Sequence, residues 1–318
     1  MKIVYENEWF IFDRPKKQNI SENIRCLRKK LKAFAYNVIL KIIRCKVVKK
    51  KYKVAIAGIF KNEAVYLKEW IEFHKLVGVE HFYLYNNNSD DNYLEVIEPY
   101  INEGIITLVQ WPYNQQQMEA YMHCIKNFSE EVTWIGFIDL DEFVIPVKTN
   151  NLYDLLKDYE DKYGSVLVYW KMFGAGRYID RDLKGLVVED FYLAAPKHHD
   201  IGKCFYNTNF EFDFDSKHNR YLHHMLWTKI KNINIPPVDV FGNVVLQGVT
   251  PPPRGEFSVQ INHYATKSWS EFKLKKAKGD VYFKVNPHDE EYFYRLNQYC
   301  THCDFKIYKF LVALKSRF

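Results

Sequence analysis

The sequence predicts an α/β protein whose central sheet is mainly parallel and flanked by helices. Between residues 54 and 138, short apolar runs alternate with segments of helical periodicity, which is typical of βαβ units. A hydrophobic content of 47% and a charged content of 26% fit a globular chain with a substantial core. The fourth apolar run leads directly into three acids, Asp139, Asp141 and Glu142. Open α/β sheets hold their ligands at the carboxyl ends of such buried strands.

Each element follows from its local pattern. Strands are expected where short apolar runs are bounded by polar or turn-forming residues, at 54–60, 81–85, 105–111 and 134–138. Helices are expected between them, at 63–77, 93–101 and 115–128, and Gly78 ends the first. Beyond Val147 the rhythm changes. There we expect a helix at 152–163, a strand at 165–169, a loop at the proline run 250–253, and helices at 268–278 and 290–317.

The net charge of +6 conceals a basic N-terminal segment. Between Ile24 and Lys53 there are twelve Lys and Arg residues and no acid. Apolar residues recur there at helical spacing, which predicts a basic amphipathic helix that lies on an anionic membrane surface or packs on the protein's own core. No basic stripe is evident elsewhere, so nucleic acid is not an expected partner. No apolar run reaches the ~18 residues of a membrane-spanning helix, so we expect a cytoplasmic protein, at most peripheral on the inner face of the cytoplasmic membrane.

The three acids predict a site for a metal ion and a phosphate group. Clustered carboxylates repel one another unless a cation neutralises them, and oxygen-rich sites suit Mg²⁺ or Mn²⁺. Taken alone, Asp-x-Asp is ambiguous, because the acids can instead cap a turn or pair with Lys and Arg. A phosphatase of the haloacid-dehalogenase type also has strand-Asp-x-Asp, but Phe143 stands where Thr or Val is usual there. In a sugar-nucleotide transferase, nucleoside-binding βα units are expected upstream of the acids, and such units precede Asp139 here.

Motifs on both sides of the acids resemble glycosyltransferase family 92 and its relatives. The matching stretches are 59–63 (IFKNE), 66–74 (YLKEWIEFH), 81–90 (HFYLYNNNSD), 134–143 (WIGFIDLDEF), 170–174 (WKMFG), 185–189 (GLVVE) and 262–268 (NHYATKS). As an ordered set they are specific, and they extend over residues 54–280. The resemblance implies a GT-A Rossmann-like fold, a nucleotide-sugar donor, Mn²⁺ or Mg²⁺ as cofactor, and an inverting transfer.

The resemblance also implies roles on the donor side. The metal ligands would be Asp139, Asp141 and His263, with Glu142 behind them; a hydrogen-bonded core histidine is the alternative for His263. Contacts to the nucleotide sugar are expected from the strand ends and the late motif, at Asn62, Glu63, Asn86, Asn88, Asp91, Asp139, Leu140, Lys267 and Lys275. The alternative for the two loops, which contain Asn62 and Asn86, is an Asx-turn or a helix N-cap.

On the acceptor side, an inverting transfer needs a general base. Glu189 and Asp190 are the candidates by position, although Asp190 departs from the Arg or Lys expected after that Glu. Trp170, Phe173 and Gly174 are the expected acceptor contacts, with core packing of the two aromatic rings as the alternative. The stretch 197–227 contains five His residues and is expected to be an acceptor-binding insertion with structural histidines.

The sequence therefore predicts a metal-dependent inverting glycosyltransferase. The expected organisation is a basic segment (1–53), a GT-A domain (54–290) with a nucleotide-sugar half (54–147) and an acceptor half (148–290), and a C-terminal helix (291–318). The expected donor is a UDP-sugar, with a hexose such as galactose. The expected acceptor is a glycan or lipid-linked glycan in surface polysaccharide or lipopolysaccharide assembly. The alternatives are the phosphatase and a non-catalytic protein that binds sugar nucleotides or serves as a membrane scaffold.

Overall fold

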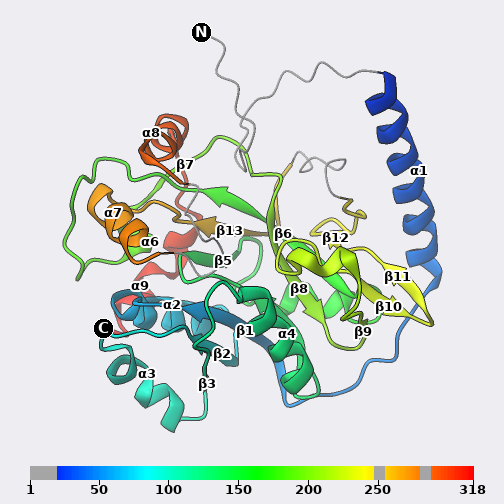
Figure 1. Ribbon diagram of the computed structural model, residues 1–318, viewed down its shortest axis with the longest axis horizontal. Helices are drawn as coiled ribbons and strands as arrows, with labels where there is room; N and C mark the ends of the chain where they lie inside the picture. The colour runs from blue at the N-terminus through cyan, green and yellow to red at the C-terminus, as the bar shows by residue number, and fades with distance from the viewer. Residues whose placement is uncertain (1–19, 247–254, 280–287) are drawn as a thin grey trace.

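The first half of the chain forms the parallel part of one large sheet. The computed structural model describes residues 20–246, 255–279 and 288–318. Strands β1 (Tyr52–Phe60), β2 (His81–Asn86), β3 (Ile106–Gln110) and β4 (Val132–Phe137) pair in parallel in the order β3-β2-β1-β4. Helices α2 (Ala64–Leu76), α3 (Tyr93–Asn102) and α4 (Gln117–Phe128) connect them (Figure 1). The expected α/β class is confirmed.

The second half extends the same sheet with mixed strand directions. From β4 the order continues β8 (Gly202–Asn207), β6 (Ser165–Met172), β13 (Val259–His263) and β5 (Glu142–Pro146), and β12 (Val238–Asp239) also pairs with β6. The pairs β4–β8, β8–β6 and β13–β5 are antiparallel, whereas β13–β6 and β12–β6 are parallel. Parallel pairs remain the majority, as expected. Since β4 pairs with β8 and β13 with β5, the two predicted halves share one sheet and one core.

Burial on both faces explains the unbroken apolar runs of these strands. In β1 the last seven residues are all buried, and every residue of β2, β4 and β8 is buried. Gly136 shows how closely β4 and β8 pack. A Cβ at this position would lie 2.4 Å from the Phe205 ring, so only glycine leaves room for that side chain. This close pairing places β8 beside the acids that follow β4.

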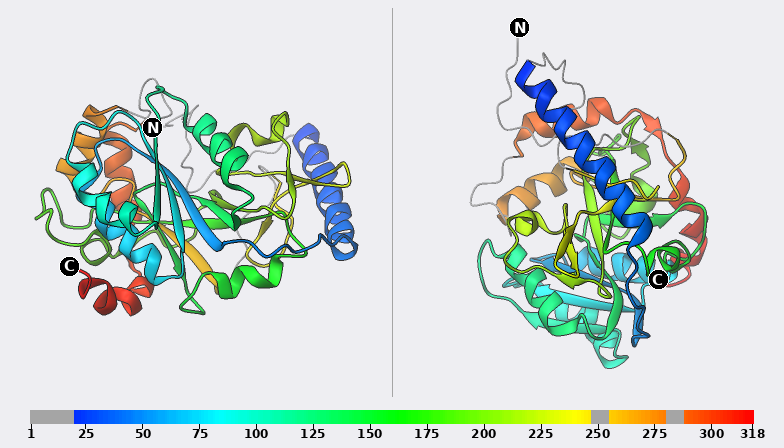
Figure 2. Two further views of the ribbon diagram at one scale, coloured as in Figure 1. Left: turned by 90° about the horizontal axis from the view of Figure 1, so that it is seen from below. Right: turned by 90° about the vertical axis from the view of Figure 1, so that its right-hand side faces the viewer.

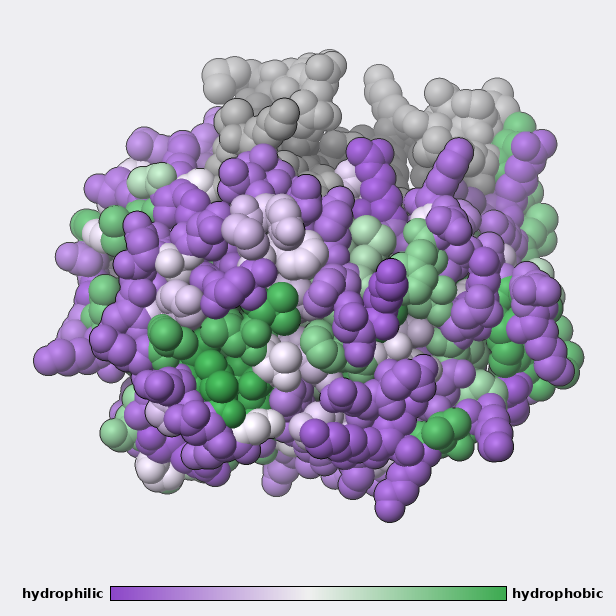
Figure 3. All heavy atoms as spheres, turned by 60° about the horizontal axis from the view of Figure 1, so that its bottom comes forward, coloured by the Kyte–Doolittle hydropathy of each residue, from purple (hydrophilic) through white to green (hydrophobic). Residues whose placement is uncertain are grey.

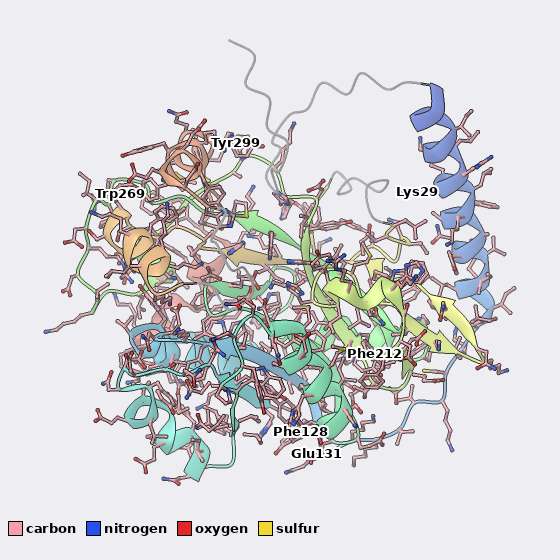
Figure 4. The ribbon with its side chains drawn as sticks, viewed as in Figure 1. Lys29, Phe128, Glu131, Phe212, Trp269 and Tyr299 are labelled. Carbon is pink, nitrogen blue, oxygen red and sulfur yellow. The ribbon has the colours of Figure 1, made fainter. Side chains whose placement is uncertain are left out.

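Shorter elements surround the sheet. Two small sheets are formed by β9 (Glu211–Phe212), β10 (Thr228–Ile230) and β11 (Ile233–Ile235), and by β7 (Leu193–Ala194) with β14 (His302–Cys303). Helix α7 (Trp269–Ala277) packs on α8 (Glu290–Tyr299) through aromatic rings, with Trp269 and Phe293 4.8 Å apart. Trp269 and Tyr299 mark these two helices in Figure 4. Short turns of helix include α6 (Val187–Asp190) and η2 (Lys217–Tyr221).

Two predicted helices are shorter than expected. The segment 152–163 contains only α5 (Tyr153–Leu156) and the 3₁₀ turn η1 (Lys157–Tyr159). The predicted C-terminal helix is divided into α8, β14, the 3₁₀ turn η3 (Lys306–Phe310) and α9 (Leu311–Lys315). The expectation of one helix there was wrong because His302 and Cys303 pair with β7, and the Asp304 amide donates to the Tyr192 carbonyl. Tertiary strand pairing therefore overrides the local helical periodicity.

The basic N-terminal segment forms the expected helix, α1 (Ile20–Ile42). It lies at one edge of the molecule, apart from the helices that cover the sheet (Figures 1 and 2). None of the described helices combines the length and the apolar character needed to cross a membrane. The predicted proline loop 250–253 lies outside the described residues.

Candidate active site

Asp139 and Asp141 lie in the short turn that joins β4 to β5, and Glu142 is the first residue of β5. The Glu142 amide donates to the Asp139 carbonyl (3.0 Å), and the Asp139 amide donates to Oε2 of Glu142 (3.1 Å). From α2, the Trp70 indole N–H lies within hydrogen-bonding distance of the Asp139 carbonyl (3.1 Å) and the Glu142 carbonyl (2.9 Å). The turn is thus clamped from both sides, which restricts where its carboxylates can point.

Asp141, Glu142 and His263 form a candidate metal centre. Each offers one ligand atom, and the three atoms lie within 4.8 Å of one another. Strand pairing brings them together, because His263 of β13 is the register partner of Glu142 in β5. All three are buried, and Oε1 of Glu142 and Nδ1 of His263 have no hydrogen-bond partner among the described residues. Buried polar atoms without hydrogen-bond partners, on carboxylate and imidazole ligands, fit a divalent cation such as Mn²⁺.

Asp139, a predicted metal ligand, does not belong to this group of ligand atoms. Its Oδ1 accepts hydrogen bonds from Gln117 Nε2 (3.0 Å) and the Tyr121 hydroxyl (3.1 Å). Gln117 and Tyr121 are one turn apart on α4, so both reach the same oxygen. Its Oδ2 accepts from the ammonium of Lys203 at 2.6 Å. The protein's own donors therefore occupy both oxygens, and the structure brings Glu142 instead to the side of Asp141.

Lys203 is a site residue that the sequence interpretation missed. Its side chain is fully buried on β8, and its ammonium lies 3.6 Å from Oε1 of Glu142 as well as beside Asp139. Burial alone would lower the pKa of Lys203, but Asp139 and Glu142 raise it above its ordinary value, so the lysine is charged. The available signal was a lysine inside the apolar strand 202–207, where an unpaired charge would be costly.

The surroundings of Asp141 and Glu142 shift their pKa values in opposite directions. Burial would raise the pKa of Asp141, but Lys275 at 2.5 Å and His263 hold it well below its ordinary value. Burial raises the pKa of Glu142 well above its ordinary value; Lys203 opposes this shift, and the neighbouring acids add to it. Burial also lowers the pKa of His263, which leaves the imidazole neutral and able to ligate a metal.

The predicted donor contact Lys267 and an unexpected ion pair of Lys278 belong to the surroundings of the site. Lys267 is buried, has a positive φ of 51°, and lies over the Tyr66 ring at 4.2 Å from its centroid. Burial lowers the pKa of Lys267. Lys278 pairs with the Glu63 carboxylate and approaches the Asn62 carbonyl at 3.4 Å. A capping box stabilises the start of α7: the side chains of Ser268 and Glu271 accept hydrogen bonds from each other's backbone amides. The first residue of the helix is therefore fixed in position, and with it the lysines that follow.

The loops that contain Asn62 and Asn86, at the ends of β1 and β2, bond to each other. The Asp90 amide donates to Asn62 Oδ1 (2.9 Å), and the Ala64 amide donates to Asp91 Oδ2 (2.8 Å). Within its own loop, Asn86 Oδ1 accepts from the Ser89 amide at 3.0 Å. These bonds match the turn-forming alternative. Asn88 Nδ2 donates to the carbonyl of Pro112 (3.3 Å). Leu140, which lies between Asp139 and Asp141 in the chain, is buried. Donor contacts from these residues remain a prediction.

The predicted acceptor platform is a packed core. Trp170 and Phe173 are 7% and 1% exposed, and a Cβ on Gly174 would lie 2.9 Å from Cβ of Cys300. Three imidazole rings surround the Trp170 indole. The distances between ring centroids are 4.5 Å to His263, 5.0 Å to His224 and 6.0 Å to His199. Core packing, the alternative left open by the sequence, describes these side chains. Burial lowers the pKa of His224 well below its ordinary value, as expected for a structural histidine.

The two candidate bases have different surroundings on α6. Glu189 accepts two hydrogen bonds from Lys315 near the C-terminus (2.8 and 2.9 Å). Asp190 pairs with Arg181 (2.9 Å), which also pairs with Glu271 (3.0 Å). Because Glu271 accepts from the Tyr66 hydroxyl at 2.8 Å, Asp190 belongs to a network that reaches the ring beneath Lys267.

Glu69, on α2, holds α6 in place and was not singled out in the sequence. Its two carboxylate oxygens accept the Val187 and Val188 amides, both at 2.9 Å. Burial raises the pKa of Glu69 to about 7. The available signal was an acid on an otherwise buried helical face, next to Trp70.

Comparisons with known proteins match a large part of this chain to one family. The sequence model of Glycosyltransferase family 92 matches residues 50–235. Proteins of that family from Oryza sativa subsp. japonica and Ricinus communis are 31% identical over 155 residues and 26% identical over 238 residues. These matches cover 48% and 71% of this chain but only 26% and 37% of the relatives, so the chain spans about a quarter to a third of their length.

Among solved structures, Staphylococcus-type TarS (the S. aureus protein, residues 1–349) aligns with a TM-score of 0.36 and 12% identity, over 59% of this chain and 60% of that one. Its complex with UDP aligns with a TM-score of 0.35. These are loose likenesses. The family match is far stronger, and it leaves the phosphatase hypothesis without support. Because the family model covers more than half of the chain, including the acids and both candidate bases, the chain belongs to glycosyltransferase family 92.

Proposed function

We propose that the enzyme is a divalent-metal-dependent inverting glycosyltransferase that uses a UDP-sugar. The observation that supports this most directly is the group Asp141, Glu142 and His263 at the carboxyl edge of the sheet, with Lys275 beside it. These three side chains would hold Mn²⁺ or Mg²⁺. When bound, the ion would neutralise the charge that develops on the leaving diphosphate. Lys275, on α7, and Lys267, in the loop before α7, would attract the same diphosphate.

The remaining donor and acceptor assignments are part of the same proposal. The loops that contain Asn62 and Asn86 would recognise the uracil and ribose through amide groups and backbone atoms. The transferred sugar is proposed to be a hexose, such as galactose, and the acceptor a glycan or lipid-linked glycan of a surface polysaccharide or lipopolysaccharide. The proposed location is the cytoplasmic face of a membrane. The basic N-terminal segment supports this location, because lipid-linked acceptors lie on such a surface.

Substitution of Asp141 tests the metal proposal. Asp141→Asn is expected to lower metal-dependent UDP-sugar hydrolysis by about 100-fold or more, because the ligand loses its charge. The Mn²⁺-induced rise in melting temperature, which reports binding to the native state, should also disappear. Both are measured against a panel of nucleotide sugars by thermal shift and donor hydrolysis.

Asp154→Asn is the matched control, because Asp154 is an exposed acid on α5 that pairs with Lys157. It should leave hydrolysis and the Mn²⁺ shift unchanged. Full hydrolysis by Asp141→Asn would overturn the metal proposal. Binding of UDP and Mn²⁺ by the native enzyme without hydrolysis or transfer to any glycan would favour the non-catalytic alternative.

A further inference from the structure

Helix α1 has one face that packs on the body of the enzyme. The Tyr36 ring meets the Trp227 ring edge-on, with centroids 5.9 Å apart, and Leu40 is 4% exposed. One helical position further round, Asn37 Oδ1 accepts a hydrogen bond from the Val244 amide at 3.2 Å. These contacts fix the rotation of α1 about its own axis, and so they determine which side chains face outward.

The outward face is a continuous apolar stripe. Its members recur at intervals of three or four residues and are exposed by 43–77%: Ile24, Leu27, Leu31, Phe34, Val38 and Ile42. At about 100° per residue they fall on one side of the helix, opposite Tyr36 and Leu40. The right-hand view of Figure 2 looks onto α1 from outside the molecule. Figure 3 shows apolar and polar side chains interspersed at this edge. No described residue covers the stripe.

Basic side chains border the stripe. Lys30 and Lys41 are exposed along one border, and Arg28 is exposed along the other. The chain after α1 adds exposed Val47 and Val48 between lysines. From Ile24 to Lys53 there is no acid at all. An exposed apolar stripe between basic borders is the arrangement of helices that lie in the plane of a membrane interface.

Charge decides between two occupants of this face. A second copy of α1 could match the three-and-four spacing as a coiled coil, but the paired helices would bring basic borders together with no acids to compensate. An anionic lipid surface supplies the opposite charge to those borders and an apolar layer to the stripe. We propose that α1 docks the enzyme on an anionic lipid surface, with the stripe at the boundary between headgroups and acyl chains. This proposal rests on the membrane location given under the proposed function, and it names the face of α1 as the surface that contacts the membrane.

Co-sedimentation with vesicles tests the docking surface in the full chain. Leu31→Glu/Phe34→Glu should lower the partition onto vesicles of equal phosphatidylcholine and phosphatidylglycerol by at least about tenfold, because two apolar anchors become charged. The control Leu94→Glu/Ile179→Glu changes two other exposed apolar residues, and thus the same net charge, and should bind as the native enzyme does. High salt should weaken native binding, and vesicles of phosphatidylcholine alone should bind little.

The variant should keep the donor hydrolysis of the native enzyme in solution, so a failure of the donor proposal and a failure of this one are distinguishable. Unchanged partition of Leu31→Glu/Phe34→Glu would overturn the proposal, as would equal binding to neutral vesicles. A lipid-free dimer that this variant dissociates, seen by analytical ultracentrifugation, would assign the stripe to a second copy instead.

Discussion

Lys203 carries its charge at a fully buried position, with its ammonium 2.6 Å from Asp139 and 3.6 Å from Glu142. A buried charge that loses its partner is strongly destabilising, because its desolvation is no longer compensated. Here one ammonium compensates two carboxylates. The acid cluster is therefore partly neutralised by the protein itself, before any metal is considered.

Substitution of this lysine should couple folding to the metal. Lys203→Met is expected to lower the free energy of unfolding of the metal-free protein by about 3 kcal/mol, because Asp139 and Glu142 lose their shared cation. Mn²⁺ should then raise the melting temperature of the variant more than that of the native protein, since the ion would supply the missing charge. Urea unfolding and thermal shift, with and without Mn²⁺, measure both effects.

Lys157→Met provides the comparison, because Lys157 forms an exposed pair with Asp154. Exposed pairs contribute little to stability because solvent screens them, so this change should be small and independent of metal. An Mn²⁺ response of Lys203→Met no larger than the native one would show that Lys203 does not act as the counter-ion of this cluster.

At the scale of elements, α6 is held in place by two other helices and by the loop that precedes it. Glu69 of α2 accepts its first amides, Arg181 pairs with Asp190, and Lys315 of α9 pairs with Glu189. Four residues of helix cannot be stable alone, so tertiary contacts determine the direction of both candidate bases. Only Asp190 is connected to the network of Glu271 and Tyr66. We therefore favour Asp190 as the general base.

The two acids of α6 can be separated kinetically. Asp190→Asn should lower kcat for transfer by about 10²-fold or more and leave the donor KM nearly unchanged, because only proton removal is affected. Glu189→Gln is the matched control and should change kcat little. Acceptor-dependent transfer and the Mn²⁺ thermal shift are measured for both. Native kcat in Asp190→Asn would exclude it, and a selective loss in Glu189→Gln would transfer the role to Glu189.

At the scale of the whole molecule, buried histidines make stability depend on pH. Burial lowers the pKa of His74 to about 3, and those of His198 and His199 to about 4. An unfolded histidine titrates near about 6.5. Below that pH the unfolded chain takes up protons that the native protein does not. The stabilisation is therefore complete above about pH 6.5 and is lost progressively as the pH falls toward about 4.

Glu69 acts in the opposite direction. Its pKa of about 7 lies above the ordinary 4.5, so its ionisation costs stability above pH 7, and this cost fades as the pH falls. Several histidines outweigh one such carboxyl group. The urea midpoint should therefore be lower at about pH 5 than at about pH 7.5. An equal or higher midpoint at the lower pH would contradict this balance.

His74→Gln isolates one contribution. His74 Nδ1 donates to the Trp70 carbonyl (2.8 Å), and Nε2 accepts from the Val144 amide (3.2 Å). A glutamine amide can make both bonds but does not titrate. The variant should lose less stability between the two pH values than the native protein does.

The local pattern was sufficient for much of this protein. Apolar runs and helical spacing predicted β1 to β4 and α2 to α4 nearly to their ends, because each of these elements forms from residues close in sequence. The acids after β4 and the distant His263 were also identified, since their residue types and motif contexts are visible without coordinates.

Only the tertiary structure decided the make-up of the candidate site and the C-terminal path. Pairing of β5 with β13 brings His263 to Glu142, and pairing of β4 with β8 brings Lys203 to Asp139. The β7–β14 pair likewise divides the predicted last helix. In each case the contact joins residues far apart in sequence. The sequence by itself therefore determined the local elements and the chemistry available. Strand register decided which side chains meet. The alternation of residues within one strand shows which face each side chain occupies, but not which residue of a distant strand lies beside it.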